Sequence, residues 1–177
     1  MNQQIIEPDA MLRVAYEDHD SVVKLICELV RIPSRAGTDP YGPVLECMST
    51  WLTGHGMVPR RLPAPGGETV AMVCEITGGQ PGPRYVLDAC LDTAPFGDEA
   101  AWEYPPGSGK ISGGWLHGRG SCDSKAGAAI FAHVAARLVP VGDQLAGSLA
   151  LLFDVDEHTG GFGGARAYFE GRDAPDR

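Results

Sequence analysis

The stretch LAGSLALLFDVDEHTGGFGG, residues 145–164, decides the fold class of this chain. Its first half is almost entirely apolar up to Phe153 and is typical of a buried strand. Acidic residues and a His follow directly, and a Gly-rich turn then leads into a short helix expected over Gly164–Phe169. A buried strand that passes through a turn into a helix is typical of an α/β architecture.

The segments before this stretch alternate between helical and strand-like patterns. In DSVVKLICELVRIPS, residues 20–34, apolar side chains recur at helical spacing and Pro33 ends the helix. Further helices are expected over 43–52 and 125–138, and strands over 57–62, 70–77 and 85–90. The predicted fold class is therefore α/β, with a mixed β-sheet flanked by helices. Residues 93–120 carry little periodicity, and an irregular connection of this length is usually functional.

Composition narrows the classes of function. The chain has 177 residues, of which 44% are hydrophobic, and a formal net charge of −9. It has neither a block of basic residues nor an apolar run near the ~18 residues that span a bilayer, so we expect no nucleic-acid or membrane partner. The five cysteines show no CxxC spacing, which predicts reduced thiols in a cytoplasmic protein. Residues 1–19 carry little pattern and are expected to be loosely ordered.

Three short segments concentrate acids, Cys and His. They read LDACLDTAP (residues 87–95), GWLHGRGSCDSKAG (114–127) and LLFDVDEHTGGFGG (151–164). Each places its reactive side chains after an apolar strand or just before a helix. In an open α/β sheet ligands collect at the carboxyl ends of strands, because neighbouring loops diverge there. We therefore expect the three segments to converge on one site.

Taken in order, the three segments resemble peptidase family M20. This family contains the zinc-dependent aminoacylases, acetylornithine deacetylase, succinyl-diaminopimelate desuccinylase and glutamate carboxypeptidase. Its usual patterns are His-x-Asp-x-Val-Pro, then Gly-Arg-Gly-x-x-Asp-x-Lys-Gly, then Asp-Glu-Glu followed by glycines. The matching residues here are CLDTAP (90–95), GRGSCDSKA (118–126) and DEHTGG (156–161). The resemblance implies that residues 20–177 are the N-terminal part of a zinc-exopeptidase-like catalytic domain, with the lid and dimerisation domain absent.

The resemblance also implies a binuclear metal site. Asp123 matches the carboxylate that bridges both ions, Glu157 the general base, and Asp92 the carboxylate that orients the first ligand. The two terminal ligand positions differ, because Cys90 stands where the family has His and His158 where it has Glu. Thiolate, carboxylate and imidazole are all zinc donors, so the expected metal ligands are Cys90, Asp123 and His158. One or two Zn²⁺ ions are expected, with Co²⁺ or Mn²⁺ as alternatives.

The sequence supports three hypotheses of function. The first is a metal-dependent hydrolase that cleaves an amide bond of an N-acyl amino acid or small peptide, with Glu157 as base on the activated water. In this hypothesis the Cys90 thiolate makes the metal a weaker Lewis acid than imidazole would. The second is a catalytically inactive relative that serves as a binding or assembly module, with Cys90 a buried thiol. The third is a thiol-based activity, which needs a base close to the sulfur of Cys90.

The resemblance carries expectations beyond the catalytic segments. In the family the catalytic domain continues with a further acidic ligand and a late His, around a lid domain that usually mediates dimerisation. We therefore expect this chain to be the front part of a longer protein and to be inactive in isolation, with a homodimer as one possible assembly. His133 and the cysteines at 27, 47 and 74 are interpreted as packed structural residues.

Overall fold

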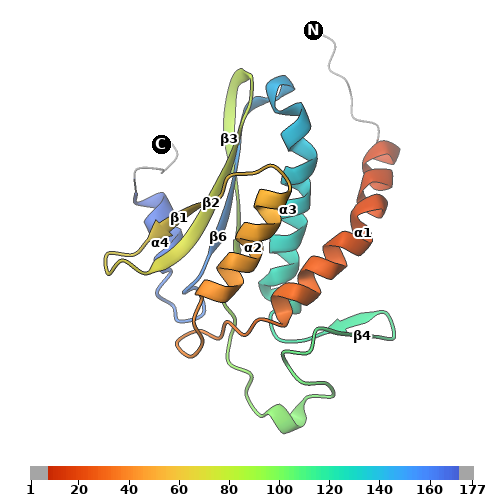
Figure 1. The fold of residues 1–177 in the computed structure, drawn as a ribbon, viewed down its shortest axis with the longest axis vertical. Coiled ribbons are helices and arrows are strands. Elements are labelled where there is room, and N and C mark those ends of the chain that lie inside the picture. Colours follow the sequence, from red (N-terminus) through yellow and green to blue (C-terminus); the bar gives the residue numbers. More distant parts are fainter. Residues whose placement is uncertain (1–7, 172–177) are drawn as a thin grey trace.

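The computed structural model describes residues 8–171 and is built around a four-stranded mixed sheet (Figure 1). In spatial order the strands are β1 (Arg60–Pro63), β2 (Thr69–Thr77), β6 (Ala146–Asp154) and β3 (Gln80–Cys90). The pairs β1–β2 and β2–β6 are antiparallel, whereas β6 and β3 run parallel. The prediction of a mixed sheet flanked by helices is confirmed.

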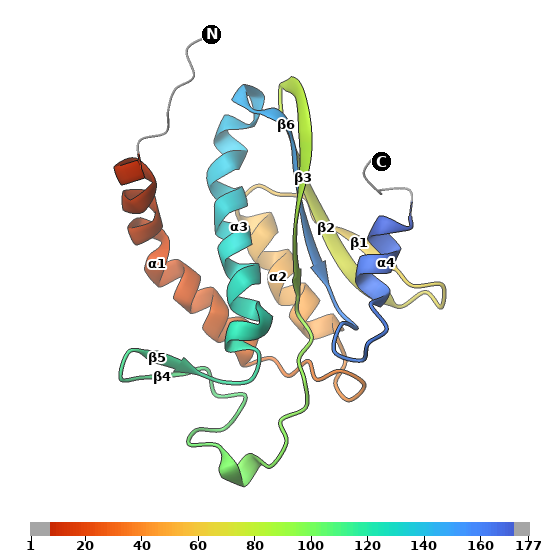
Figure 2. The same cartoon turned by 180° about the vertical axis from the view of Figure 1, so that it is seen from behind.

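Helices cover both faces of this sheet (Figure 2). Three of them, α1 (Pro8–Val30), α2 (Gly42–Gly54) and α3 (Ala126–Leu138), lie on one face, and α4 (Gly163–Phe169) lies on the other. Side chains of β6 alternate between the two cores: Phe153 packs in the core shared with the three helices, whereas Leu152 packs with Tyr168 of α4. This double burial explains why β6 reads as a nearly continuous apolar run.

Helix α1 begins at Pro8, well before the start at residue 20 that the sequence predicted. Residues 8–19, expected to be loosely ordered, are therefore helical, and residues 1–7 lie outside the described part. The larger apolar side chains of this half of the helix are exposed, namely Met11, Leu12 and Tyr16. Because they form no buried stripe, the sequence carries no helical periodicity here. Within residues 8–171, none of the helices has the length and apolar content needed to cross a bilayer.

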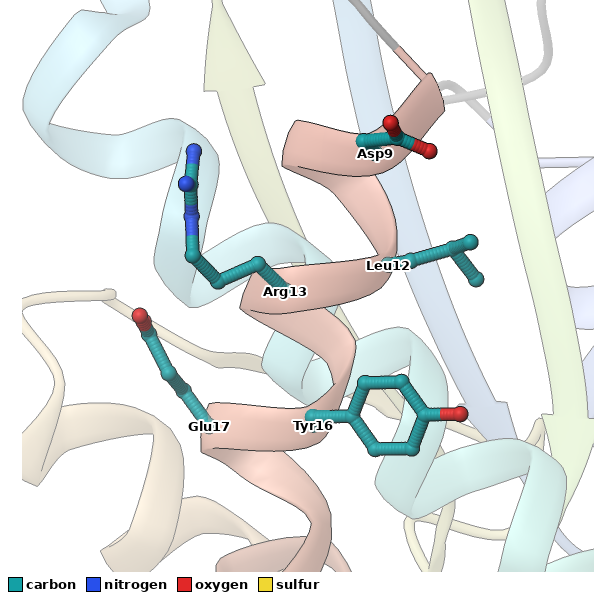
Figure 3. Close-up of a pocket in the computed structure, with 5 residues that line it drawn as sticks. All are labelled: Asp9, Leu12, Arg13, Tyr16 and Glu17. Carbon is teal, nitrogen blue, oxygen red and sulfur yellow. The ribbon is translucent and has the colours of Figure 1, made fainter.

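A shallow hollow of about 550 Å³ lies along this exposed half of α1 (Figure 3). The residues that line it are Asp9, Leu12, Arg13, Tyr16 and Glu17. All of them belong to one helix, so no second element closes the hollow into a binding site.

The link between β2 and β3 crosses the start of β6. Strand β3 begins at Gln80, five residues before the strand expected over 85–90, so the link is only Gly78-Gly79. Gly147 makes this crossing possible, because its φ is +85° and a Cβ there would lie 1.9 Å from the carbonyl oxygen of Pro83. The backbone N–H of Gly78 donates to the Gly147 carbonyl at 2.7 Å.

The long connection from β3 to α3 leaves the sheet at its carboxyl edge (Figures 1 and 2). It contains a helical turn over Glu99–Ala101 and a small hairpin of β4 (Lys110–Ser112) and β5 (Trp115–His117). It then forms a tight turn over Ser121–Lys125 that enters α3. Since β3 and β6 are parallel, their carboxyl ends lie at the same edge. The first and third chemically rich segments therefore start from neighbouring points.

Candidate metal centre

Asp92 ties the first chemical segment to the third. It lies just beyond the end of β3 and is fully buried. Its Oδ2 accepts a hydrogen bond from the backbone N–H of His158 at 3.0 Å, and its Oδ1 accepts one from Glu157 at 3.4 Å. A buried carboxylate needs such donors to offset its lost hydration. Asp92 therefore holds the main chain of both residues at the end of β6.

A tight turn built by Asp156 presents these two residues. Asp156 has a φ of +76°, a left-handed conformation that Asp tolerates better than most residues. Its carboxylate accepts hydrogen bonds from the Thr159 hydroxyl and from the backbone N–H of Gly163. A Cβ on Gly161 would lie 2.3 Å from Asp156 Oδ2, so a larger residue there would displace the Asp156 carboxylate. The Gly-rich turn thus folds around the Asp156 side chain before α4 begins.

The imidazole of His158 lies among three carboxylates. Its Nδ1 is 3.1 Å from Glu157 Oε2 and 3.6 Å from Asp92 Oδ2, and its Nε2 is 3.5 Å from Asp123 Oδ2. Despite these neighbours, Nδ1 is buried without a hydrogen-bond partner among the described residues. A buried nitrogen left unpaired needs an explanation, and a metal ion among these oxygens would provide one.

A compact donor cluster forms at this edge of the sheet. The Cys90 sulfur, an Asp92 carboxylate oxygen and a His158 ring nitrogen all lie within 4.8 Å of one another. Sulfur, oxygen and nitrogen donors in such a set suit zinc or a similar ion. The residues present therefore fit the metal that the sequence led us to expect.

The structure brings four of the five predicted site residues together and leaves the fifth, Asp123, outside the cluster. It brings Cys90, Asp92, Glu157 and His158 to one edge of the sheet. The carboxylate of Asp123, expected as the bridge, approaches the Nε2 side of the imidazole but does not belong to the compact cluster. Its side chain is 82% exposed, because it projects from the turn over Ser121–Lys125 toward solvent.

Burial changes the charge states at this edge. It raises the pKa of the Cys90 thiol to about 12, although the hydrogen bond with Ser124 acts in the opposite direction. The thiol is therefore neutral near pH 7, and binding a metal through sulfur must release its proton. Burial also raises the pKa of Asp154 to about 7, and the nearby carboxylates of Asp88 and Asp92 act in the same direction. The crowding of acids here favours a cation.

Two residues that sequence reasoning did not single out hold the middle segment. The Ser124 hydroxyl donates to the Cys90 carbonyl at 2.9 Å and lies 3.3 Å from its sulfur. The Lys125 ammonium donates to the carbonyls of Leu29 and Ile32, at 2.8 and 3.0 Å. Both follow Asp123 closely, and Lys125 matches the Lys of the family pattern, but their partners are remote in the sequence and no spacing indicates them.

The residues interpreted as structural lie apart from this cluster. His133 is buried within α3, where its Nδ1 lies 2.8 Å from the Ala129 carbonyl and its Nε2 lies 2.9 Å from the Ser21 hydroxyl. Cys27 and Cys74 are buried in the core, and Cys47 is half-buried against it. The interpretation of His133 as a packed residue is confirmed.

Comparison with known proteins identifies the family of this chain. The sequence model described as peptidase family M20/M25/M40 matches residues 86–177. Succinyl-diaminopimelate desuccinylase of Rhodospirillum centenum is 34% identical over 146 residues, which cover 81% of this chain and 37% of that protein. The chain thus spans well under half the length of this relative.

Solved structures of low sequence identity share the fold. The M20 family metallo-carboxypeptidase Sso-CP2 of Sulfolobus solfataricus superposes with a TM-score of 0.73 at 18% identity, over 85% of this chain and 34% of that one. The YXEP protein of Bacillus subtilis, a dinuclear metal-binding peptidase from the same family, superposes with a TM-score of 0.63 at 20% identity. That match covers 88% of this chain and 40% of the other.

Proposed function

Because the chain belongs to peptidase family M20, we propose that it carries the metal site of a hydrolase that cleaves amide bonds in N-acyl amino acids or small peptides. The observation that carries this proposal is the buried Nδ1 of His158, which has no hydrogen-bond partner within residues 8–171 and belongs to the residue that clusters with the Cys90 sulfur and the Asp92 carboxylate. These donors come from two segments that are far apart in the sequence but adjacent at one sheet edge.

Cys90, His158 and Asp123 are the residues that would hold the metal. The thiolate and Nδ1 of the imidazole would bind one ion on the buried side, and Asp123, which faces Nε2 of the same imidazole, would serve a second ion on the solvent side. We propose zinc, with cobalt or manganese as substitutes, because a soft sulfur donor beside nitrogen and oxygen suits zinc best. When bound, the ion supplies polarisation of the substrate carbonyl and a lower pKa for water.

Glu157 is the proposed general base. Its side chain is 41% exposed, so it can reach a water molecule, while its backbone N–H is held by Asp92. A fixed main chain with a solvent-accessible carboxylate suits a group that takes a proton from water and delivers it to the leaving nitrogen. Asp92 is a positioning residue in this scheme, because it fixes the main chain of Glu157 and His158 together.

The relative named as a desuccinylase guides the choice of a first substrate. We propose N-succinyl amino acids as the acylated class to test, followed by other N-acyl amino acids and dipeptides. All five cysteines are free, which supports a reducing compartment such as the cytoplasm. We also propose that the protein forms a homodimer.

The arrangement around Cys90 disfavours a thiol nucleophile. Among the described residues, the sulfur has a hydrogen-bond contact with the Ser124 hydroxyl, which is not a base, whereas the His158 ring nitrogen within 4.8 Å makes no hydrogen bond with it. Burial also raises the pKa of the thiol. A nucleophilic cysteine instead needs an adjacent base or a lowered pKa. The metal-dependent hypothesis explains the position of the Cys90 sulfur without requiring an adjacent base or a lowered pKa.

Metal analysis after dialysis against zinc tests the proposal. We expect wild-type protein to retain zinc and the Cys90→Ala and His158→Ala variants to lose it. The matched control is Cys122→Ala, which removes an exposed thiol directly beside Asp123 and is expected to retain zinc. Wild-type protein that retains no zinc, or a Cys90→Ala variant that retains as much as wild type, would contradict the proposal.

A further inference from the structure

A buried lysine joins the turn over Ser121–Lys125 to the end of α1. Lys125 is only 1% exposed, and its ammonium donates to the carbonyls of Leu29 and Ile32 at 2.8 and 3.0 Å. Leu29 lies in the last turn of α1, where carbonyl groups carry partial negative charge, and its carbonyl also accepts from the backbone N–H of Ile32 at 3.2 Å. Ile32 lies two residues beyond the helix. The two carbonyl acceptors make the burial of the ammonium charge tolerable.

The same turn is anchored on its other side to β3. The Ser124 hydroxyl donates to the carbonyl of Cys90, the last residue of that strand. The entry to the turn is also tight, since Gly120 has a φ of +81° and a Cβ there would lie 2.5 Å from Thr93 Cγ2. The backbone N–H of Lys125 closes the turn by donating to the Gly120 carbonyl at 3.0 Å.

Asp123 lies within this anchored turn but is not itself anchored. Its exposed carboxylate accepts no hydrogen bond from the residues that the structure describes, and its Oδ2 lies 3.5 Å from Nε2 of the His158 imidazole. The place of this carboxylate therefore depends on where its main chain is held. That main chain is held by Ser124 and Lys125, the two residues that follow it.

We propose that Lys125 is a positioning residue for the metal site. By fixing the turn to the end of α1, it keeps the Asp123 carboxylate beside Nε2 of His158, where it would bind the second ion of the proposed site. This inference rests on the proposed metal site. Helix α1 contributes no side chain to the donor cluster. In this proposal it influences metal affinity through the carbonyl group that holds Lys125.

Cobalt titration of the metal-free protein tests this role. In Lys125→Met we expect the cobalt dissociation constant to rise about 10–100-fold, the range typical for loss of a group that orients a ligand. The visible absorption of the cobalt-loaded protein should change as well, because one carboxylate is displaced. The matched control is Lys110→Met, an exposed lysine of β4, which should leave both measurements at the wild-type values.

Urea denaturation of the metal-free proteins separates positioning from stability. A lysine that only caps α1 would lower the denaturation midpoint of Lys125→Met and leave the cobalt affinity and spectrum unchanged, which would overturn the inference. If Lys125→Met does not fold, Lys125→Gln keeps one donor without the charge. Weakened cobalt binding by folded Lys125→Gln supports the inference, and wild-type affinity overturns it. Wild-type protein that binds no cobalt would instead remove the proposed metal site.

Discussion

The backbone N–H of His158 donates to Oδ2 of Asp92 at 3.0 Å, which joins residues 66 positions apart in the sequence. A second bond from Glu157 reaches the other oxygen of the same carboxylate. Because Asp92 is fully buried, water cannot replace these bonds if the carboxylate is altered. The position of the segment that carries both Glu157 and His158 therefore depends on one charged group.

Asp92→Asn tests this dependence. The amide can turn only one oxygen toward the two N–H donors, so one of them faces an NH₂ group and remains unpaired. We expect the free energy of unfolding to fall by about 1–3 kcal/mol, the usual cost of an unsatisfied buried polar group. Urea denaturation measures the change, with the exposed Glu103→Gln as the matched control. Equal midpoints for Asp92→Asn and wild type would show that the bonds to Asp92 contribute little.

Glu157→Gln separates a catalyst from a binding module. A carboxamide cannot accept a proton, so we expect the rate of amide hydrolysis to fall by about 100-fold or more while zinc retention stays unchanged. Initial rates with an N-succinyl amino acid, measured on the zinc-loaded full-length protein, give the comparison, and Glu103→Gln again serves as the control. A zinc-loaded wild type that is no faster than Glu157→Gln would favour a non-catalytic function.

Cys90→Ser tests for a sulfur ligand without an activity assay. Thiolate bound to Co²⁺ produces an intense charge-transfer absorption in the near ultraviolet, which a hydroxyl ligand does not. We expect this band in cobalt-loaded wild type and its loss in Cys90→Ser. Cys122→Ser is the matched control, because that exposed thiol lies next to Asp123 but outside the donor cluster. A band that survives in Cys90→Ser and disappears in Cys122→Ser would place the sulfur ligand at the wrong residue.

The Arg35–Asp39 pair in the loop after α1 should make the stability of the protein fall at acidic pH. The side chain of Arg35 donates to both carboxylate oxygens of Asp39, at 2.8 and 2.9 Å, and this pairing lowers the pKa of Asp39. A depressed folded-state pKa stabilises the protein above the unfolded value of about 3.9, and this contribution is lost as the pH falls through the folded-state pKa.

We therefore expect Asp39→Asn to lower the urea midpoint at pH 7. The difference in urea midpoint between the variant and wild type should narrow as the pH is lowered below about 4, where the Asp39 carboxylate of the unfolded state begins to protonate, and should vanish below the lower folded-state pKa. Glu68→Gln, an exposed carboxylate, is the control and should show no such narrowing. If the difference in urea midpoint between Asp39→Asn and wild type stays constant with pH, the charge of Asp39 does not contribute to stability.

Phe153→Ala tests the core beneath the site. Phe153 is completely buried on β6, one residue before Asp154 ends the strand. Removing a buried aromatic ring leaves a cavity and typically costs about 3–5 kcal/mol. Thermal or urea denaturation should show this loss, whereas Phe169→Ala at a position 44% exposed should change stability far less. Similar losses for both variants would contradict the assignment of the core.

The sequence by itself determined the elements whose apolar faces are buried. Helices α2 and α3 and strand β6 were predicted closely, because burial on one or two faces leaves a periodic or continuous apolar pattern. The first half of α1 was missed for the same physical reason, since its apolar side chains are exposed and leave no pattern. The residue types of the three chemical segments were also evident from the chain alone.

Only the tertiary structure decided which of these residues meet. Cys90 and His158 cluster with Asp92, while Asp123 remains on the solvent side, a difference that sequence order does not encode. Contacts between segments depend on the parallel pairing of β3 with β6 and on the packing of α1 against the turn before α3. Local patterns record the faces that each element buries, whereas distances across the sheet edge arise only when those faces pack together.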